Sequence, residues 1–168
     1  MQLEDIYDYK NRLMQDLLTS EEIVHLLDEK IDINDAYDKL AYVQVFPSEY
    51  VPQTMQDGFT YICFDVDVQQ ESIDKTFLKP ILYIWVFAHR SRMRLPNGEG
   101  VRTDKICSEI CKKINGSRYY GLGELNLYSV KRFAPILDTI GKVMTFYTRE
   151  FNRPRTGALD TPANRKNY

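Results

Sequence analysis

The chain has 168 residues, of which 43% are hydrophobic and 27% charged, and its net charge is −2. This length and balance are typical of one globular domain and exclude collagen-like, low-complexity and intrinsically disordered proteins. No apolar run reaches the roughly 18 residues that a membrane span needs. The acidic N-terminus lacks a signal-peptide layout, and three cysteines do not favour a secreted disulfide scaffold. We therefore expect a protein made in a reducing cytoplasm, with no membrane partner.

The first half of the chain predicts two helices followed by strands. Apolar residues at helical spacing predict a helix over 3–18, and Thr19 with Glu22 forms a capping box before a short second helix. The acidic segment 28–41 is expected to be a loop. Three segments rich in β-branched and aromatic residues predict strands: 42–46, 59–68 and 77–88. The last is apolar on both faces, which suits a central strand with cover on both sides, and a neighbouring subunit is one candidate for that cover.

The second half predicts a basic loop, one helix and two further strands. The loop over 89–102 contains the turn signal Pro-Asn-Gly. Thr103 is the expected cap of a helix that runs to about Ile114 and ends at Asn-Gly. Two later segments predict strands: 124–133 and 142–151.

The order of these elements predicts the fold class. Two helices, three strands, a helix and two strands with short links indicate an α+β domain. We expect a mostly antiparallel sheet of about five strands, flanked by the N-terminal helices and one long central helix. The expected domain covers 1–151, and 152–168 is expected to be a polar, basic tail.

Charge is distributed unevenly along the chain. Residues 1–88 carry 17 acidic and 6 basic side chains, whereas 89–168 carry 7 acidic and 16 basic ones. Three readings follow: the halves attract each other within one fold, the basic half forms a nucleic-acid or partner surface, or subunits pack head to tail with opposite charges in contact.

Two groups of residues raise the question of metal binding. Cys107 and Cys111 lie one helical turn apart, and zinc would need them to converge with residues such as Cys63 and His89. Both cysteines share a stripe with three isoleucines, so packing is the favoured interpretation and no metal or cofactor is predicted.

The second group is acidic. Asp65, Asp67 and Glu71 could hold magnesium in a nuclease, with Lys79 as the nearest basic residue. Because the aspartates alternate with apolar residues, the solvent face of a half-buried strand is the favoured interpretation. No motif around a serine or cysteine proposes a catalytic nucleophile.

Arginines form the candidate binding surface. Arg90, Arg92 and Arg94 alternate, so an extended backbone would point all three to one side, towards phosphates or an acidic protein surface. A solvated loop is the alternative. The candidate interface residues are six arginines: Arg90, Arg92, Arg94, Arg102, Arg153 and Arg155.

The layout of the chain resembles the tail terminator (tail completion) proteins of long-tailed bacteriophages. The resemblance covers about 3–153 and is one of layout, carried by a series of segments: IYDYKNRLMQDLLTSEEIVHLLDE, VQVFP, FTYICFDVDV, PILYIWVFAH, KICSEICKKI with Asn-Gly, and MTFYTREFNR. The basic loop and the tail are not matched to the family.

The resemblance implies a structural virion protein and not an enzyme. Such proteins form a hexameric ring that caps the tail tube protein in the virion tail or neck and meets the head–tail connector or stopper protein. The basic loop and tail could also contact DNA passing through the ring. Another neck, head-completion or baseplate component is the alternative, and a metal-dependent nuclease is a more distant one.

Overall fold

The computed structural model describes residues 3–52, 59–70, 77–120, 123–148 and 150–151. The helices are α1 (Leu3–Leu18), α2 (Glu21–Leu27), α3 (Ala36–Leu40) and α4 (Arg102–Ile114), with short 3-10 helices η1 (Ile33–Asp35), η2 (Arg90–Arg92) and η3 (Pro96–Gly98). The strands are β1 (Val45–Phe46), β2 (Thr60–Gln70), β3 (Phe77–His89), β4 (Asn126–Phe133), β5 (Thr139–Tyr147) and β6 (Glu150–Phe151).

One sheet organises these elements. Its strands follow the order β1-β2-β3-β5-β4, and the short β6 pairs with β3 beyond the end of β5. Only β1 and β2 run parallel. The α+β class and the mostly antiparallel five-strand path are therefore confirmed. The expected long central helix is wrong, because α4 has 13 residues and α1, at the N-terminus, is longer with 16.

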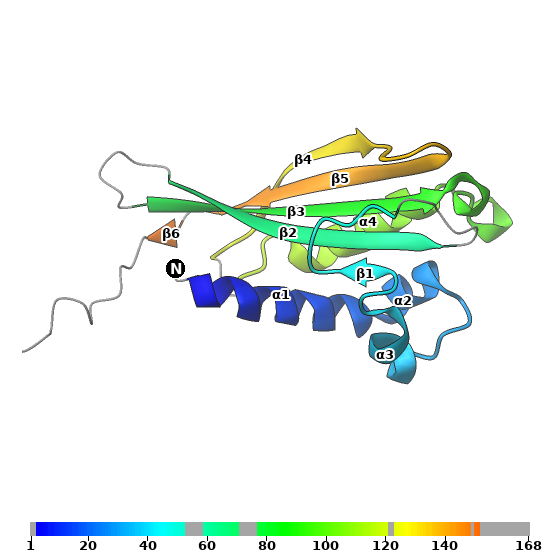
Figure 1. Cartoon of the computed structure of the whole chain (residues 1–168), viewed down its shortest axis with the longest axis horizontal. Helices are drawn as coiled ribbons and strands as arrows, with labels where there is room; N and C mark the ends of the chain where they lie inside the picture. Colours follow the sequence, from blue (N-terminus) through cyan, green and yellow to red (C-terminus); the bar gives the residue numbers. More distant parts are fainter. Residues whose placement is uncertain (1–2, 53–58, 71–76, 121–122, 149, 152–168) are drawn as a thin grey trace, which may run out of the picture.

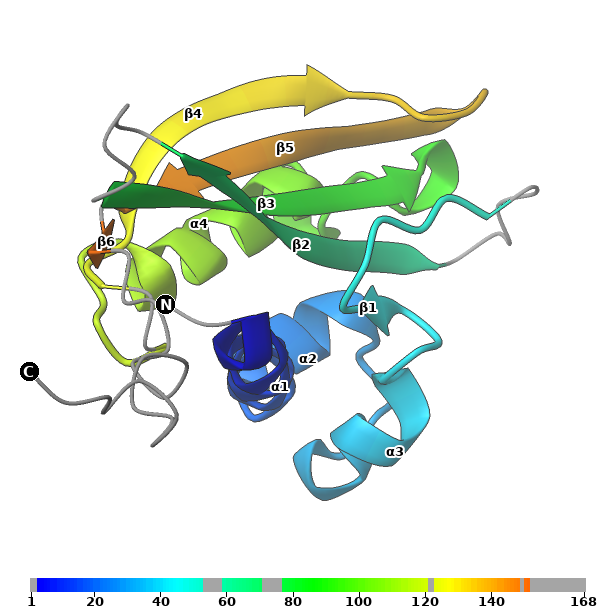
Figure 2. The same cartoon turned by 60° about the vertical axis from the view of Figure 1, so that its left-hand side comes forward.

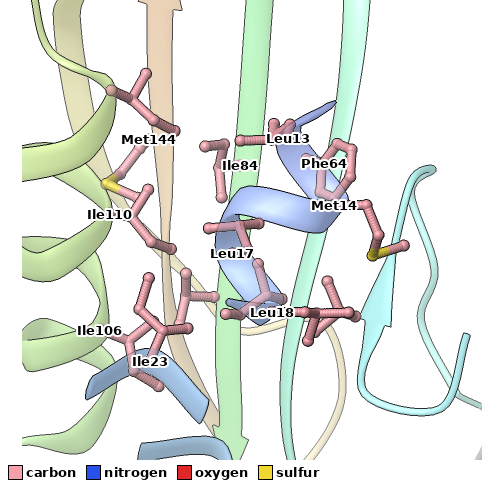
Figure 3. Close-up of a cluster of buried hydrophobic side chains, with 14 of the residues drawn as sticks. Leu13, Met14, Leu17, Leu18, Ile23, Phe64, Ile84, Ile106, Ile110 and Met144 are labelled. Atoms are coloured by element: carbon pink, nitrogen blue, oxygen red, sulfur yellow. The ribbon is translucent and has the colours of Figure 1, made fainter. Parts of the chain in front are cut away.

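All the main helices lie on the same face of the sheet. Figures 1 and 2 show α1 beside β2, α4 beside β3 and β5, and α2 between the two helices. The core lies between this helical layer and the sheet, as Figure 3 shows. Its central side chains are almost completely buried and come from all the layers: Leu13, Leu17, Ile23, Phe64, Ile84, Ile106, Ile110 and Met144.

The junction between α1 and α2 differs from the expected capping box. Helix α1 has the predicted bounds. The hydroxyl of Thr19 points back to this helix and donates to the carbonyl oxygen of Gln15 at 2.9 Å. Ser20 is the N-cap residue of α2, which begins at Glu21. The cap position is therefore occupied by Ser20, one residue after Thr19, and Thr19 is not the cap.

The segment predicted as an acidic loop contains η1 and α3. Asp32 starts η1 by accepting the backbone N–H of Asn34 at 2.9 Å, and Lys39 pairs with Asp35 at 2.8 Å. The loop prediction for 28–41 is therefore wrong over 33–40, where local carboxylate contacts support helical turns. The strand predicted over 42–46 shortens to β1 because Tyr42 has a positive φ of 60°.

Strand β3 is the central strand, as its composition predicts. It pairs with β2 on one side and with β5 on the other. Leu82, Ile84 and Val86 are fully buried in the main core beneath the helices. The alternate positions of β3 face the side of the sheet that carries no helix.

The second half departs from the predictions at the element boundaries. Helix α4 begins at Arg102 with Val101 as its N-cap, so Thr103 lies inside the first turn. Thr103 is buried there, and its hydroxyl has no hydrogen-bond partner among the described residues. The predicted end at Asn115-Gly116 is confirmed, since Gly116 has a φ of 78°. The predicted strand over 142–151 divides into β5, which starts earlier, and β6.

Candidate partner-binding surfaces

The basic loop between β3 and α4 is coiled and not extended. His89 caps η2 by accepting the Ser91 N–H at 3.3 Å, and Arg94 forms an isolated bridge with Val101. The prediction that alternation points Arg90, Arg92 and Arg94 to one side is therefore wrong, because η2 turns the backbone through the first two of them.

The loop arginines have different environments. Arg90 and Arg94 are exposed. Arg92 is partly buried, and its Nη2 donates to the Leu27 carbonyl oxygen at 3.4 Å. Arg92 and Arg94, together with Arg102 and Glu29, line a hollow of about 630 Å³ under the loop. The hollow thus contains guanidinium groups, which can bind carboxylate or phosphate oxygens.

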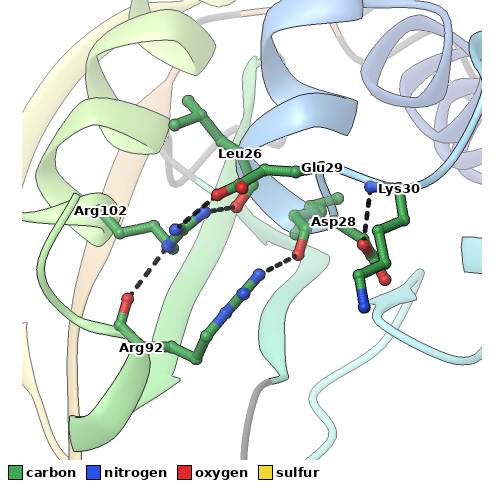
Figure 4. Close-up of polar contacts among 7 residues, drawn as sticks. Leu26, Asp28, Glu29, Lys30, Arg92 and Arg102 are labelled. Atoms are coloured by element: carbon green, nitrogen blue, oxygen red, sulfur yellow. Dashed lines mark hydrogen bonds and ion pairs between the residues drawn. The ribbon is translucent and has the colours of Figure 1, made fainter. Parts of the chain in front are cut away.

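Arg102 is an internal anchor and not part of an exposed basic surface. It is 3% exposed. Figure 4 shows its guanidinium between α2 and the loop, donating to the carbonyl oxygen of Leu26 at 2.7 Å and of Arg92 at 3.0 Å. Its Nη2 also pairs with Glu29 at 3.1 Å. Arg102 thus satisfies a carbonyl group at the C-terminal end of α2, where helix carbonyls lack backbone partners.

The same contact shifts the titration of Glu29. The hydrogen bond from Arg102 lowers the pKa of the carboxyl below its ordinary value of 4.5. Because this pKa is lower in the folded chain, the contribution to stability is present above pH 4.5 and is lost as the pH falls through the folded-state pKa. Glu29 is 40% exposed, so solvent weakens this contribution.

The face of the sheet without helices carries a second, aromatic cluster. Tyr61 stacks on Phe87 with ring centroids 5.3 Å apart, and Phe87 meets Phe133 edge to face at 5.6 Å. Phe46 and Tyr50, stacked at 4.0 Å, lie against one end of this cluster. These aromatic side chains therefore cover part of the apolar face of β3 that no helix covers.

A groove of about 500 Å³ runs between α4 and β4. Its apolar lining includes Leu127 and Val130, which are 36% and 49% exposed, together with Cys111 and Met144. This surface was not predicted from the sequence. The feature that marks the groove is the edge strand β4, whose apolar residues Leu127 and Val130 are exposed beside Cys111 of α4.

The cysteines do not form a metal site within the described residues. No group of three or more histidine, cysteine or carboxylate side chains is close enough there to hold an ion. Cys107 packs in the main core, as predicted. Burial raises the pKa of the Cys63 and Cys107 thiols to about 12.

These environments predict selective alkylation. In the dissociated, folded subunit we expect iodoacetamide at pH 8 to label the partly buried Cys111 and to spare Cys63 and Cys107, because thiolates are the reactive species. Mass spectrometry of peptides before and after unfolding measures this. Equal labelling of all three thiols in the folded chain would contradict the described packing.

The carboxylates considered for magnesium have different environments. Asp65 pairs with Lys10 of α1 at 2.5 Å and accepts the Val66 N–H at 2.7 Å, whereas Asp67 is exposed. Lys79 lies over the ring of Tyr147, with its Nζ 4.5 Å from the centroid. Glu71 is outside the described residues. The predicted tail, with Arg153 and Arg155, also lies outside them.

The two charged halves are joined only in part. Arg102–Glu29 and Lys113–Asp16 link the acidic half to the basic half. Other ion pairs, such as Lys10–Asp65 and Lys142–Asp104, lie within one half. Exposed charge of opposite sign therefore remains on the two halves for contact with other molecules.

Taken together, the fold and its surfaces define an α+β protein with a sheet covered by helices on one face. A family model described as YomW matches residues 20–148, and the chain belongs to this family. A comparison with curated proteins finds no match. Within the described residues, no helix is long and apolar enough to span a bilayer.

Proposed function

We propose that this chain is a structural protein of a bacteriophage virion. Its specific role in this proposal is that of a tail terminator, in which a hexameric ring caps the tail tube and joins it to the head connector or stopper. Membership of the YomW family supports a phage-encoded protein. The layout of helices on one face of a mostly antiparallel sheet agrees with the resemblance to tail terminators.

The single observation that carries the proposal is the one-sided arrangement of the sheet. The helices cover one face, while the opposite face carries an aromatic cluster and the α4–β4 groove leaves apolar side chains exposed. The exposed apolar side chains of the groove, Leu127 and Val130, are typical of surfaces that bind other proteins. In this proposal the chain acts by assembly and not as an enzyme.

Imaging of tail tubes tests the proposed role. Purified tubes of the phage that encodes the chain would be mixed with the protein and examined by negative-stain electron microscopy. We expect extra ring-shaped density at one end of each tube. Tubes that stay bare at both ends while the protein associates with heads or baseplates would contradict the terminator role in favour of another virion component.

The exposed loop arginines are expected to contribute to attachment. The variant Arg90→Glu/Arg94→Glu should change the free energy of unfolding by no more than about 0.5 kcal/mol per site, because exposed charges contribute little to stability. It should reduce capping of tubes, since reversed charge would repel an acidic partner. Urea denaturation and counting of capped tubes measure the two effects.

A matched control carries the same charge change elsewhere. Lys30→Glu/Lys39→Glu replaces two exposed lysines near α2 and on α3. We expect this control to cap tubes as the unmodified chain does. Equal losses in both variants would show that net charge, and not the loop, decides attachment.

A further inference from the structure

We propose that copies of this chain join edge to edge, with β4 of one subunit pairing with β2 of the next. The inference rests on the proposed ring and names the contact between its subunits. It follows from the free strand edges, the strand directions, the charges at the two edges and the groove beside β4.

Both ends of the sheet have a free edge within the described residues. Strand β4 ends the path, and no strand pairs with its outer side over its 8 residues. At the other end, β1 covers β2 only at Ile62 and Cys63, which leaves 64–70 unpaired on that side. Free edges of similar length are templates for pairing with another chain.

The backbone of β2 directs hydrogen-bonding groups at this edge. The Ile62 N–H donates to the Gln44 carbonyl oxygen at 2.8 Å, so the backbone groups of Ile62 point away from β3. Because these groups alternate in direction along a strand, those of Phe64, Val66 and Val68 also point to the free edge. The Val66 N–H is taken by the Asp65 carboxylate at 2.7 Å. The amides of Phe64 and Val68 have no partner among the described residues. At this edge the Val66 N–H is therefore already hydrogen-bonded in the free subunit, whereas those of Phe64 and Val68 are available to another strand.

Strand directions favour pairing between unlike edges. Because β2, β3, β5 and β4 alternate in direction, β2 and β5 run one way and β3 and β4 run the other. A neighbour related by rotation about an axis along the strands keeps these directions. Its β2 would then lie antiparallel to β4, and the alternation of the sheet would continue from subunit to subunit. Such a head-to-tail contact can close into a ring.

The charges at the two edges are opposite. The strand register places Cys63, Trp85, Val143 and Lys131 in one row across the sheet, so Lys131 shares a face with Asp65 and Asp67. Lys131 and Asp67 are exposed, and neither has an ion-pair partner among the described residues. In an unshifted register, pairing of β4 with β2 would place Lys131 diagonal to Asp65 and Asp67 opposite Asn126, so the two edges bring opposite charges near each other. Pairing of β4 with β4 or of β2 with β2 would instead bring like charges together, which destabilises cross-strand pairs.

The groove beside β4 fits the same neighbour. The Lys10–Asp65 pair places α1 next to the free edge of β2, so α1 accompanies β2 into the contact. In the paired arrangement this helix would approach the α4–β4 groove. Tyr7 of α1 is 70% exposed, and its ring would cover the exposed Leu127 and Val130. The contact thus buries apolar surface as well as strand edges.

Thiol cross-linking tests the inference. In a Cys111→Ser background, the variant Asp67→Cys/Asn126→Cys, whose two positions share one row of the sheet, would be treated with a short flexible bismaleimide, which tolerates small shifts of register. Native mass spectrometry would be recorded in parallel, with and without tail tubes. We expect the double variant to give a ladder of covalent species up to the hexamer on denaturing gels, because each subunit offers both edges.

The single variants are the controls. Asp67→Cys alone and Asn126→Cys alone should each give no linked product, while their mixture should give covalent dimers. Dimers from Asn126→Cys alone would show pairing of β4 with β4 and overturn the inference. A ring without links in the double variant would overturn this interface and leave the proposed function intact. A chain that stays monomeric even with tail tubes present would overturn both.

Discussion

Replacing Arg102 with alanine is expected to lower the free energy of unfolding by about 3 kcal/mol. The guanidinium is almost completely buried and donates to the carbonyl oxygens of Leu26 and Arg92. Alanine would leave both acceptors without this donor and would separate α2 from the loop before α4. Urea denaturation monitored by circular dichroism measures the change as a lower transition midpoint.

Two further variants distinguish the hydrogen bonds of the Arg102 guanidinium from the effect of its positive charge. Arg94→Ala removes an exposed arginine from the same loop and should change stability by no more than about 0.5 kcal/mol. Arg102→Lys keeps the charge but cannot reproduce the fork of donors, so it should fall between the other two. Equal stability of Arg94→Ala and Arg102→Ala would contradict the anchoring role of Arg102.

Replacing Gly141 with alanine is expected to cost about 3 kcal/mol, at the upper end for an overpacked core. Gly141 lies between Phe87 and Phe133 in the strand register, and these two rings meet across it. A Cβ at this position would lie 2.3 Å from the Val86 carbonyl oxygen and 2.6 Å from the Phe87 Cβ. Because the first of these atoms belongs to the backbone of β3, relief requires the strands to separate. Thermal and urea unfolding measure the loss.

Gly98→Ala is the comparison for Gly141→Ala. Gly98 has a φ of 76°, but a Cβ there would have no atom within 4 Å. Its cost should therefore be limited to the strain of a left-handed backbone, about 1–2 kcal/mol. If Gly141→Ala were no more costly than Gly98→Ala, the close approach of β5 to β3 would be contradicted.

Much of the fold could be predicted because long elements repeat their pattern many times. The helix over 3–18 and the two-faced strand beginning at Phe77 each provide several turns or residue pairs of consistent spacing. Short elements could not be predicted in this way. Helix α3 follows a turn that Asp32 caps, and β1 is limited by the backbone at Tyr42, so both depend on single residues.

The candidate binding surface was harder to predict than the fold. A row of alternating arginines is compatible with an exposed face, but it does not distinguish Arg94 from the buried Arg102. That distinction arises only when α2 places the Leu26 carbonyl against the start of α4. The α4–β4 groove likewise requires the register of β4 on β5, which no local pattern specifies.

Native mass spectrometry of the purified protein, with and without magnesium and zinc, tests the central claim most directly. The proposed ring predicts a closed species of six times 19.8 kDa with no bound metal. A monomer or dimer that takes up metal would contradict this account, and would direct attention to nuclease assays on Asp65 and Asp67.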